Sequence, residues 1–251
     1  MLSKIKIKWI KSLGLKKNRD EEGVFVAEGF KITSDLFPFL KCRFLAVTDD
    51  DLRAYFEEYT DEIELISQKE YKSITFQKSP QGVLAVFEKP DFENDMDEIS
   101  KNLNLALDDI QDPGNLGTII RLADWFGIKD IFCSLHCADV FSPKTVQATM
   151  GAIARVRVFY TDLPEFLKEL QGKTTVYGTF MNGENIYNEN LTQNGIIVMG
   201  NEGNGISPEV EKFVTRKISI PGFSLENVAS ESLNVGIATA ITVSEFRRRK
   251  L

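Results

Sequence analysis

Three short stretches of this 251-residue sequence each follow a strand-like apolar run and place a glycine or a small amide where a ligand could approach the backbone. In chain order they are 115–123 (NLGTIIRLA), 200–205 (GNEGNG) and 232–235 (SLNV). Glycine lets a ligand approach the backbone without meeting a Cβ atom. Amide, hydroxyl and guanidinium groups can hydrogen-bond a polar ligand. Each stretch is therefore a candidate part of a binding or catalytic site.

The glycine-rich stretch at 200–205 follows an apolar run and precedes a helix start at Ser207-Pro208. Its backbone groups can lie close to a ligand, and the helix start adds unpaired N–H groups. A dinucleotide-binding loop is one alternative. Such a loop follows the first strand of its domain and is followed by an acid about 20 residues later, whereas residues 217–222 read KISIPG. A dinucleotide therefore fits poorly, and a purely structural turn is the other alternative.

Arg121 shares a helix face with Gly117, because the two lie one turn apart on the helix predicted at 117–126. Its fork of donors suits a phosphate or ribose oxygen. The alternative is a surface arginine paired with Asp124 or Glu202. Because arginine stays protonated at working pH, we expect it to position a hydroxyl and stabilise a developing alkoxide rather than act as a free base.

The type, order and approximate spacing of the three stretches resemble the motifs of the SpoU/TrmH-type RNA 2′-O-ribose methyltransferases, part of the SPOUT superfamily. The resemblance implies in-line transfer of a methyl group from S-adenosylmethionine to a ribose 2′-hydroxyl. This reaction depends mostly on the alignment of the hydroxyl oxygen, the methyl carbon and the sulfur. Arg121 would contact the target nucleotide. The groups that orient Arg121 and the ribose would be Asn115, Glu202, Ser232 and Asn234. Glu202 as a simple turn cap is an equal alternative.

The same resemblance implies where the cofactor lies. Main-chain groups would read the adenine and apolar side chains would enclose its ring, with a site made of Gly200, Asn201, Gly203, Ile220 and Leu233. The sequence departs from the family at 221–232, which is a few residues longer than the usual Ile-Pro-Met form and has Gly222 in place of the methionine. This segment borders both ligands, so it is a candidate determinant of target choice.

Strand and helix signals alternate regularly after residue 100. Strands are predicted at 103–110, 131–135, 156–160, 175–180, 196–199 and 217–220, and helices begin near 117, 142, 162, 207 and 230. This alternation indicates an α/β fold with a parallel sheet covered on both faces. Ligands bind such sheets beyond the carboxyl ends of the strands, where all three motifs lie. The resemblance adds a deep trefoil knot and a homodimer through this domain.

The acidic stretch at 88–98 shows no apolar period and predicts a linker. It divides the chain into an RNA substrate-binding domain at 1–95 and a SPOUT methyltransferase domain at 100–251. The first domain resembles the small α/β, ribosomal-protein-like domain that precedes many of these methyltransferases, through its basic start and the stretches 25–29 and 79–86.

Within the first domain, strands are predicted at 44–48 and 82–87, and a helix at 52–59. The first residues alternate like a strand, but Leu2, Ile5 and Trp9 also share a helical face. We favour a helix there.

Net charge is the main compositional objection to RNA binding, because the formal charge is −7 and phosphate contacts require basic surface. The first nineteen residues nevertheless contain no acid. The predicted RNA contacts there are Lys4, Lys8, Lys11, Lys16, Lys17 and Arg19. The alternative to RNA binding is that these basic residues form a solvated N-terminus without a ligand. The basic tail at 247–250 also suits a helix C-terminus, whose dipole attracts cations.

Cysteine usage argues against a disulfide framework and against a zinc site. The sequence has three cysteines, with no second closely spaced pair of the CxxC type: Cys42, Cys133 and Cys137. His136 lies beside two of them, but packed side chains are a better interpretation than a metal site, and we expect no metal. No apolar run approaches the roughly 20 residues that cross a bilayer, and the N-terminus lacks signal-peptide features. We expect a cytoplasmic location.

The sequence therefore predicts an S-adenosylmethionine-dependent RNA 2′-O-methyltransferase. Ribosomal RNA is favoured over transfer RNA because the first domain resembles a ribosomal protein. A non-catalytic RNA-binding or assembly factor and a nucleotide-dependent enzyme using 200–205 are the alternatives. The modified nucleotide cannot be read from the sequence, since every ribonucleotide carries a 2′-hydroxyl.

Overall fold

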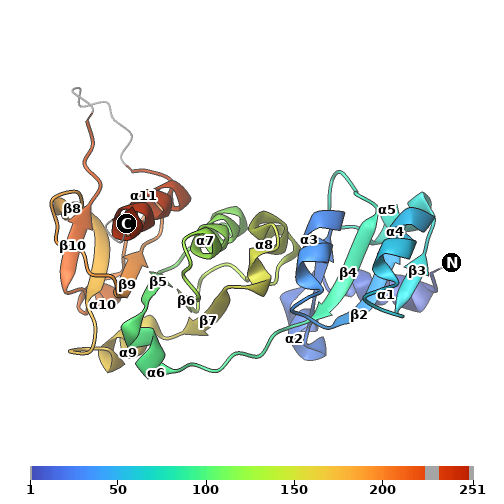
Figure 1. Cartoon of the computed structure of the whole chain (residues 1–251), viewed down its shortest axis with the longest axis horizontal. Helices are drawn as coiled ribbons and strands as arrows, with labels where there is room; N and C mark the ends of the chain where they lie inside the picture. Colours follow the sequence, from blue (N-terminus) through green and yellow to red (C-terminus); the bar gives the residue numbers. More distant parts are fainter. Residues whose placement is uncertain (1, 224–231, 249–251) are drawn as a thin grey trace. The chain divides into compact units, whose positions relative to one another are not determined.

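The computed structural model describes residues 2–223 and 232–248. The chain forms two compact units, each with its own sheet (Figure 1). The first unit comprises Met1–Phe92 with Asp139–Arg155, and the second comprises Glu93–Ala138 with Val156–Leu251. Residues 139–155 therefore belong to the first unit although they lie in the second half of the sequence.

The first unit is a four-stranded sheet with the order β1-β4-β2-β3. Strands β1 (Val24–Glu28) and β2 (Cys42–Val47) run antiparallel to β4 (Val83–Glu88), while β3 (Ile63–Leu65) is parallel to β2. The other elements are α1 (Lys4–Ser12), α2 (Lys16–Glu22), α3 (Phe30–Leu36), α4 (Asp50–Phe56), α5 (Gln68–Ile74), α8 (Pro143–Thr149) and the 3-10 helix η1 (Ala152–Ala154).

Alternate residues of this sheet face different helix layers, as the strand period requires. Val24 and Val26 belong to one buried cluster with Ile10 of α1 and Tyr71 of α5. On the other face, the rings of Phe37 and Phe87 lie 5.2 Å apart and those of Phe37 and Phe56 lie 5.3 Å apart. The helix favoured for the first residues is confirmed, and the Ser3 side chain caps it by accepting the Lys6 N–H at 3.1 Å.

The second unit is a six-stranded sheet with the order β10-β8-β9-β5-β6-β7. Every strand pair in it is parallel, which confirms the predicted parallel sheet. Its strands are β5 (Leu103–Leu107), β6 (Asp130–Ser134), β7 (Arg157–Thr161), β8 (Val176–Asn185), β9 (Gly195–Met199) and β10 (Arg216–Ser219). Its helices are α6 (Met96–Lys101), α7 (Pro113–Trp125), α9 (Leu163–Glu169), α10 (Pro208–Glu211) and α11 (Val235–Arg248).

Helices cover both faces of the parallel sheet (Figure 1). Side chains of α6, α9 and α10 share one buried cluster with β5, β6, β8 and β9. On the other face, α7 and α11 lie side by side, and Phe246 of α11 packs edge-on against Tyr177 with ring centroids 4.9 Å apart. Arg247 ties the end of α11 to the end of α7, because its Nε donates to the Phe126 carbonyl at 2.9 Å. No helix in the described ranges is long and apolar enough to span a bilayer.

Several element boundaries differ from the sequence-based expectation, among them that of β5, which ends at Leu107 and not at 110. Helix α7 begins at Pro113, before the expected position 117, because Asp112 caps the helix and proline suits its first turn. Helix α6 begins inside the predicted linker at 88–98, after the N-cap Asp95. The last helix begins at Val235. The expected start near 230 and most of the longer segment at 221–232 lie outside the described residues, which omit 224–231.

Candidate active site

The three predicted motifs meet beyond one edge of the parallel sheet. Neighbouring strands β5 and β9 each precede one motif, and the third precedes α11. Asn115 joins them, since its Nδ2 donates to Glu202 Oε1 at 2.5 Å and its Oδ1 accepts from Asn234 Nδ2 at 3.0 Å. We call these three residues the Asn115 cluster. The structure therefore brings together three of the predicted orienting residues.

Helix capping fixes the members of the Asn115 cluster. The Asp112 side chain accepts the Asn115 N–H at 2.9 Å and so places Asn115 on the first turn of α7. Asn234 Oδ1 accepts from Gly236 N at 3.0 Å and from Ile237 N at 3.3 Å at the start of α11. Because the oxygen of Asn234 is used by the helix, its Nδ2 is the atom that points to Asn115.

Arg121 is exposed on α7 and makes no hydrogen bond or ion pair with any residue that the structure describes. The alternative of an arginine paired with Asp124 or Glu202 is therefore not observed, and Glu202 accepts from Asn115 instead. The Arg121 guanidinium is therefore available to an anionic or hydroxyl ligand. Ser232 is also exposed, and within 2–223 and 232–248 no hydrogen bond joins it to the Asn115 cluster.

The glycine-rich stretch is a tight loop, which we call the cofactor loop (200–205). Asn201 and Gly205 exchange two backbone hydrogen bonds of 3.0 and 2.9 Å. The Asn201 side chain also accepts the N–H groups of Gly203 and Asn204 at 2.9 and 3.0 Å. A Cβ atom at Gly200 would lie 2.3 Å from the Gly205 carbonyl carbon, so the turn itself requires that glycine.

Gly203 differs from Gly200, because among the described residues an added Cβ there would meet only Asn201 Oδ1, at an ordinary 3.5 Å. The space beside Gly203 is therefore open to a ligand. Leu233 is 48% exposed and Ile220 is half-buried, so both can offer apolar surface. Open backbone and apolar side chains suit the adenine of S-adenosylmethionine, and these residues fit that cofactor.

Sequence reasoning did not single out Asp108 and Asp109, which directly follow β5. Asp108 is buried, and its Oδ2 accepts the Ser207 N–H at 2.7 Å. The Asp109 carbonyl accepts Asn201 Nδ2 at 2.9 Å. Two consecutive acids directly after a buried apolar strand were the available signal.

The described residues contain no group of three or more His, Cys, Asp or Glu that could hold a metal. His136 is exposed, whereas Cys133 is buried. A hydrogen bond with Cys133 is the largest cause that lowers the pKa of Cys137 to about 7. Cys137 Sγ also accepts the Ile110 N–H at 3.3 Å, which ties it to the turn after β5.

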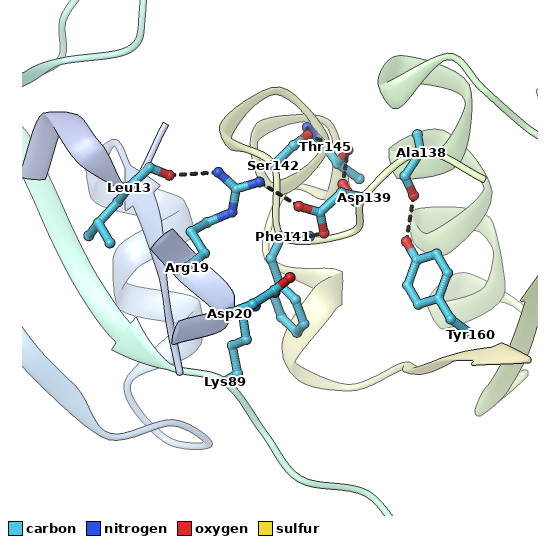
Figure 2. Close-up of polar contacts among 10 residues, drawn as sticks. All are labelled: Leu13, Arg19, Asp20, Lys89, Ala138, Asp139, Phe141, Ser142, Thr145 and Tyr160. Atoms are coloured by element: carbon cyan, nitrogen blue, oxygen red, sulfur yellow. Dashed lines mark hydrogen bonds and ion pairs between the residues drawn. The ribbon is translucent and has the colours of Figure 1, made fainter. Parts of the chain in front are cut away.

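Arg19 is buried in the first unit, with 2% of its side chain exposed. Its Nη1 donates to the Leu13 carbonyl at 2.6 Å, and its Nη2 forms an ion pair with Asp139 (Figure 2). A buried and paired guanidinium cannot reach an RNA phosphate, so we remove Arg19 from the predicted RNA contacts. The remaining predicted contacts are exposed: Lys4, Lys8, Lys11, Lys16 and Lys17.

Comparison with known proteins defines the class of this site. The family model described as the SpoU rRNA Methylase family matches residues 102–244, more than half of the chain. A model for the MRM3-like substrate binding domain matches residues 4–85. A methylase-type parallel sheet thus follows a substrate-binding domain of a known kind. The chain belongs to the SpoU rRNA Methylase family.

Individual relatives match nearly the whole chain. The 23S rRNA (guanosine(2553)-2′-O)-methyltransferase RlmP of Bacillus subtilis is 29% identical, over 96% of both chains. A solved structure of a TrmH-family protein from Porphyromonas gingivalis is 41% identical, with a TM-score of 0.89 and 99% of both chains covered. A solved rRNA methyltransferase from Sinorhizobium meliloti with bound AdoMet is 29% identical, with a TM-score of 0.86 and 100% of this chain and 97% of that chain covered.

Proposed function

We propose that this protein transfers the methyl group of S-adenosylmethionine to a ribose 2′-hydroxyl of ribosomal RNA, with transfer RNA the less favoured substrate. The observation that carries the proposal is the Asn115 cluster, assembled from all three motifs in a SpoU-family chain, together with an Arg121 on the same helix that is exposed and pairs with none of the described residues. The names of relatives similar to this chain support the acceptor and the cofactor, since one methylates a guanosine 2′-oxygen of 23S rRNA and another binds AdoMet.

Each residue of the site has a defined task in this reaction. S-adenosylmethionine supplies an electrophilic methyl group when bound. Glu202 and Asn234 hold the Asn115 amide in one orientation. The ribose is therefore contacted by polar groups in fixed positions. Arg121 positions the 2′-hydroxyl and stabilises the negative charge that develops on its oxygen. The hydroxyl proton leaves to an RNA phosphate or to water.

The domain assignment follows the same proposal. Residues 1–95 would bind the RNA substrate and residues 100–251 would catalyse methyl transfer, and the family-model matches at 4–85 and 102–244 support this division. Within the second range, residues 139–155 pack with the first unit. The cofactor loop, 218–222 and 232–234 would form the trefoil knot. A reducing, cytoplasmic location stays a prediction from the cysteine usage.

We also propose a homodimer through the methyltransferase domain. Exposed apolar side chains on α7 and α11 support it, since Trp125 is 83% exposed and Ile237 is 54% exposed. Burial of such side chains favours association. Light scattering should give a mass of twice 28.4 kDa, and a mass of 28.4 kDa at micromolar concentration would contradict the dimer.

The decisive experiment incubates the purified protein with methyl-labelled S-adenosylmethionine and unmodified ribosomal RNA, followed by nuclease digestion and mass spectrometry. We expect label in a 2′-O-methyl nucleoside. S-adenosylmethionine binding without transfer to any ribosomal or transfer RNA would favour the non-catalytic binding factor. No binding of S-adenosylmethionine would contradict the proposed function.

The same assay tests the role of Arg121. Arg121→Ala should abolish transfer and leave S-adenosylmethionine affinity near that of the wild type, because the exposed side chain supports no other described residue. Arg121→Lys should restore little activity, since a lysine lacks the planar fork of donors. Lys129→Ala removes another exposed cation of the same unit and serves as the control. Loss of cofactor binding in Arg121→Ala would refute this role.

A further inference from the structure

The residue that follows strand β5 contacts the chain on both sides of the cofactor loop. Asp108, which is 5% exposed, follows Leu107 directly. Its N–H donates to the Met199 carbonyl at 2.9 Å, just before the loop. Its Oδ2 accepts the Ser207 N–H at 2.7 Å, just after the loop. One buried residue therefore holds the chain on either side of the loop.

Asp109 holds the beginning of the loop. Its carbonyl accepts Asn201 Nδ2 at 2.9 Å, and its N–H donates to Ser134 Oγ at 2.9 Å. Its φ of +60° lies in the left-handed region that residues other than glycine rarely adopt. Hydrogen bonds on both sides explain how this conformation persists.

A single connection, Asp108 to Asn115, thus fixes the cofactor loop at two points and the chain just after it at a third. Asp109 holds Asn201, Asn115 holds Glu202, and Asp108 holds Ser207. All three bonds are internal to the protein. The loop is consequently arranged for its ligand before the ligand binds, which reduces the ordering that binding must impose.

We propose that Asp108 is a positioning residue that sets the affinity for S-adenosylmethionine by fixing the end of the cofactor loop. This inference rests on the proposed function. Asp108 acts through Ser207, because its buried carboxylate accepts the Ser207 N–H. Removing its acceptor oxygen leaves the Ser207 N–H without its partner, and the loop end loses its fixed place. Affinity for the cofactor then falls, while the Asn115 cluster and Arg121 remain to carry out transfer.

Three variants test this assignment in the full chain by calorimetric titration with S-adenosylmethionine and by kinetics. Asp108→Leu removes the acceptor and should raise the Kd and the KM for S-adenosylmethionine about tenfold, with kcat at saturating cofactor within about twofold of the wild type. Asp108→Asn keeps an acceptor oxygen and should restore the affinity. Ser207→Pro removes the donor while leaving Asp108 intact. The Ser207 φ of −63° already matches proline, so this variant should also raise the Kd.

The matched control is Asp162→Ala. Asp162 caps α9 in the same unit by accepting the Glu165 N–H at 3.1 Å, so its loss should lower stability without changing cofactor affinity. Unchanged affinity in both Asp108→Leu and Ser207→Pro would overturn the inference. It would equally be overturned by an Asp108→Asn variant as weak as Asp108→Leu, or by an equal loss of affinity in Asp162→Ala. Failure of the wild type to bind S-adenosylmethionine would instead overturn the proposed function.

Discussion

At the scale of single residues, two of the three glycines of the cofactor loop, Gly200 and Gly203, meet different constraints. Gly200 lies where a Cβ would overlap the backbone of Gly205, so any side chain there disturbs the turn itself. Gly203 is exposed and has open space beside it. A substitution at Gly203 therefore separates ligand binding from folding, whereas one at Gly200 does not.

Gly203→Val should lower S-adenosylmethionine affinity at least about tenfold, because the side chain fills the space offered to the ligand. The free energy of unfolding without cofactor should change by no more than about 0.5 kcal/mol, as at other exposed sites. Gly200→Ala should lose stability and affinity together. Titration calorimetry and thermal unfolding measure the two quantities. Normal affinity in Gly203→Val would show that the cofactor binds elsewhere.

Single-residue roles could be predicted where a motif carried them. Asn115, Glu202 and Asn234 were expected to act together, and the structure places them within hydrogen-bonding distance. Asp108 was missed because its task depends on Ser207, which lies far along the chain. Arg19 was misassigned for the same reason, since a lysine-rich neighbourhood predicts an exposed cation and gives no sign of a distant acid.

At the scale of elements, residues 139–155 pack within the first unit although the sequence places them among the strands of the second. Phe141 packs on Phe25 of β1 with ring centroids 5.0 Å apart, and Asp139 pairs with the buried Arg19 (Figure 2). The strand–helix alternation correctly predicted a helix from Ser142. It could not predict which sheet that helix covers, because the period of a helix says nothing about its partner.

Arg19→Met should lower the free energy of unfolding of the first unit by about 3 kcal/mol, because it leaves the Asp139 carboxylate without its buried partner. Adding Asp139→Leu should recover most of that loss, since an apolar pair needs no charge compensation. Chemical denaturation followed by circular dichroism measures both.

The control for this prediction is Lys17→Met, which removes an exposed cation from the same helix, α2. Lys17 lies 3.7 Å from Glu21 in a solvent-exposed pair, so the change should be below about 0.5 kcal/mol. Equal effects of Arg19→Met and Lys17→Met would show that the ion pair with Asp139 contributes nothing to the stability of the first unit.

At the scale of the whole molecule, the negative net charge is the sum over unlike surfaces, and the first unit has one basic surface and one acidic surface. Helix α1 presents Lys4, Lys8 and Lys11, spaced four and three residues apart and all exposed. On the opposite side of the sheet, α4 and the residues that flank it are rich in exposed acids: Asp49, Asp50, Asp51, Glu57, Glu58, Asp61 and Glu62. Composition alone averages these surfaces, so the overall charge could not decide whether RNA binds.

If RNA binds along α1, changing Lys4, Lys8 and Lys11 together to glutamine should weaken RNA binding and reduce the slope of log K against log salt by about two to three, because each phosphate contact contributes about 0.7 to 0.9. The control changes Lys31, Lys41 and Arg53 to glutamine. These cations are paired with Asp35, Glu88 and Glu57, and their loss alters the net charge by the same amount. Fluorescence anisotropy at several salt concentrations distinguishes the two variants. Equal salt slopes in both would show that net charge, and not the surface of α1, governs the attraction to RNA.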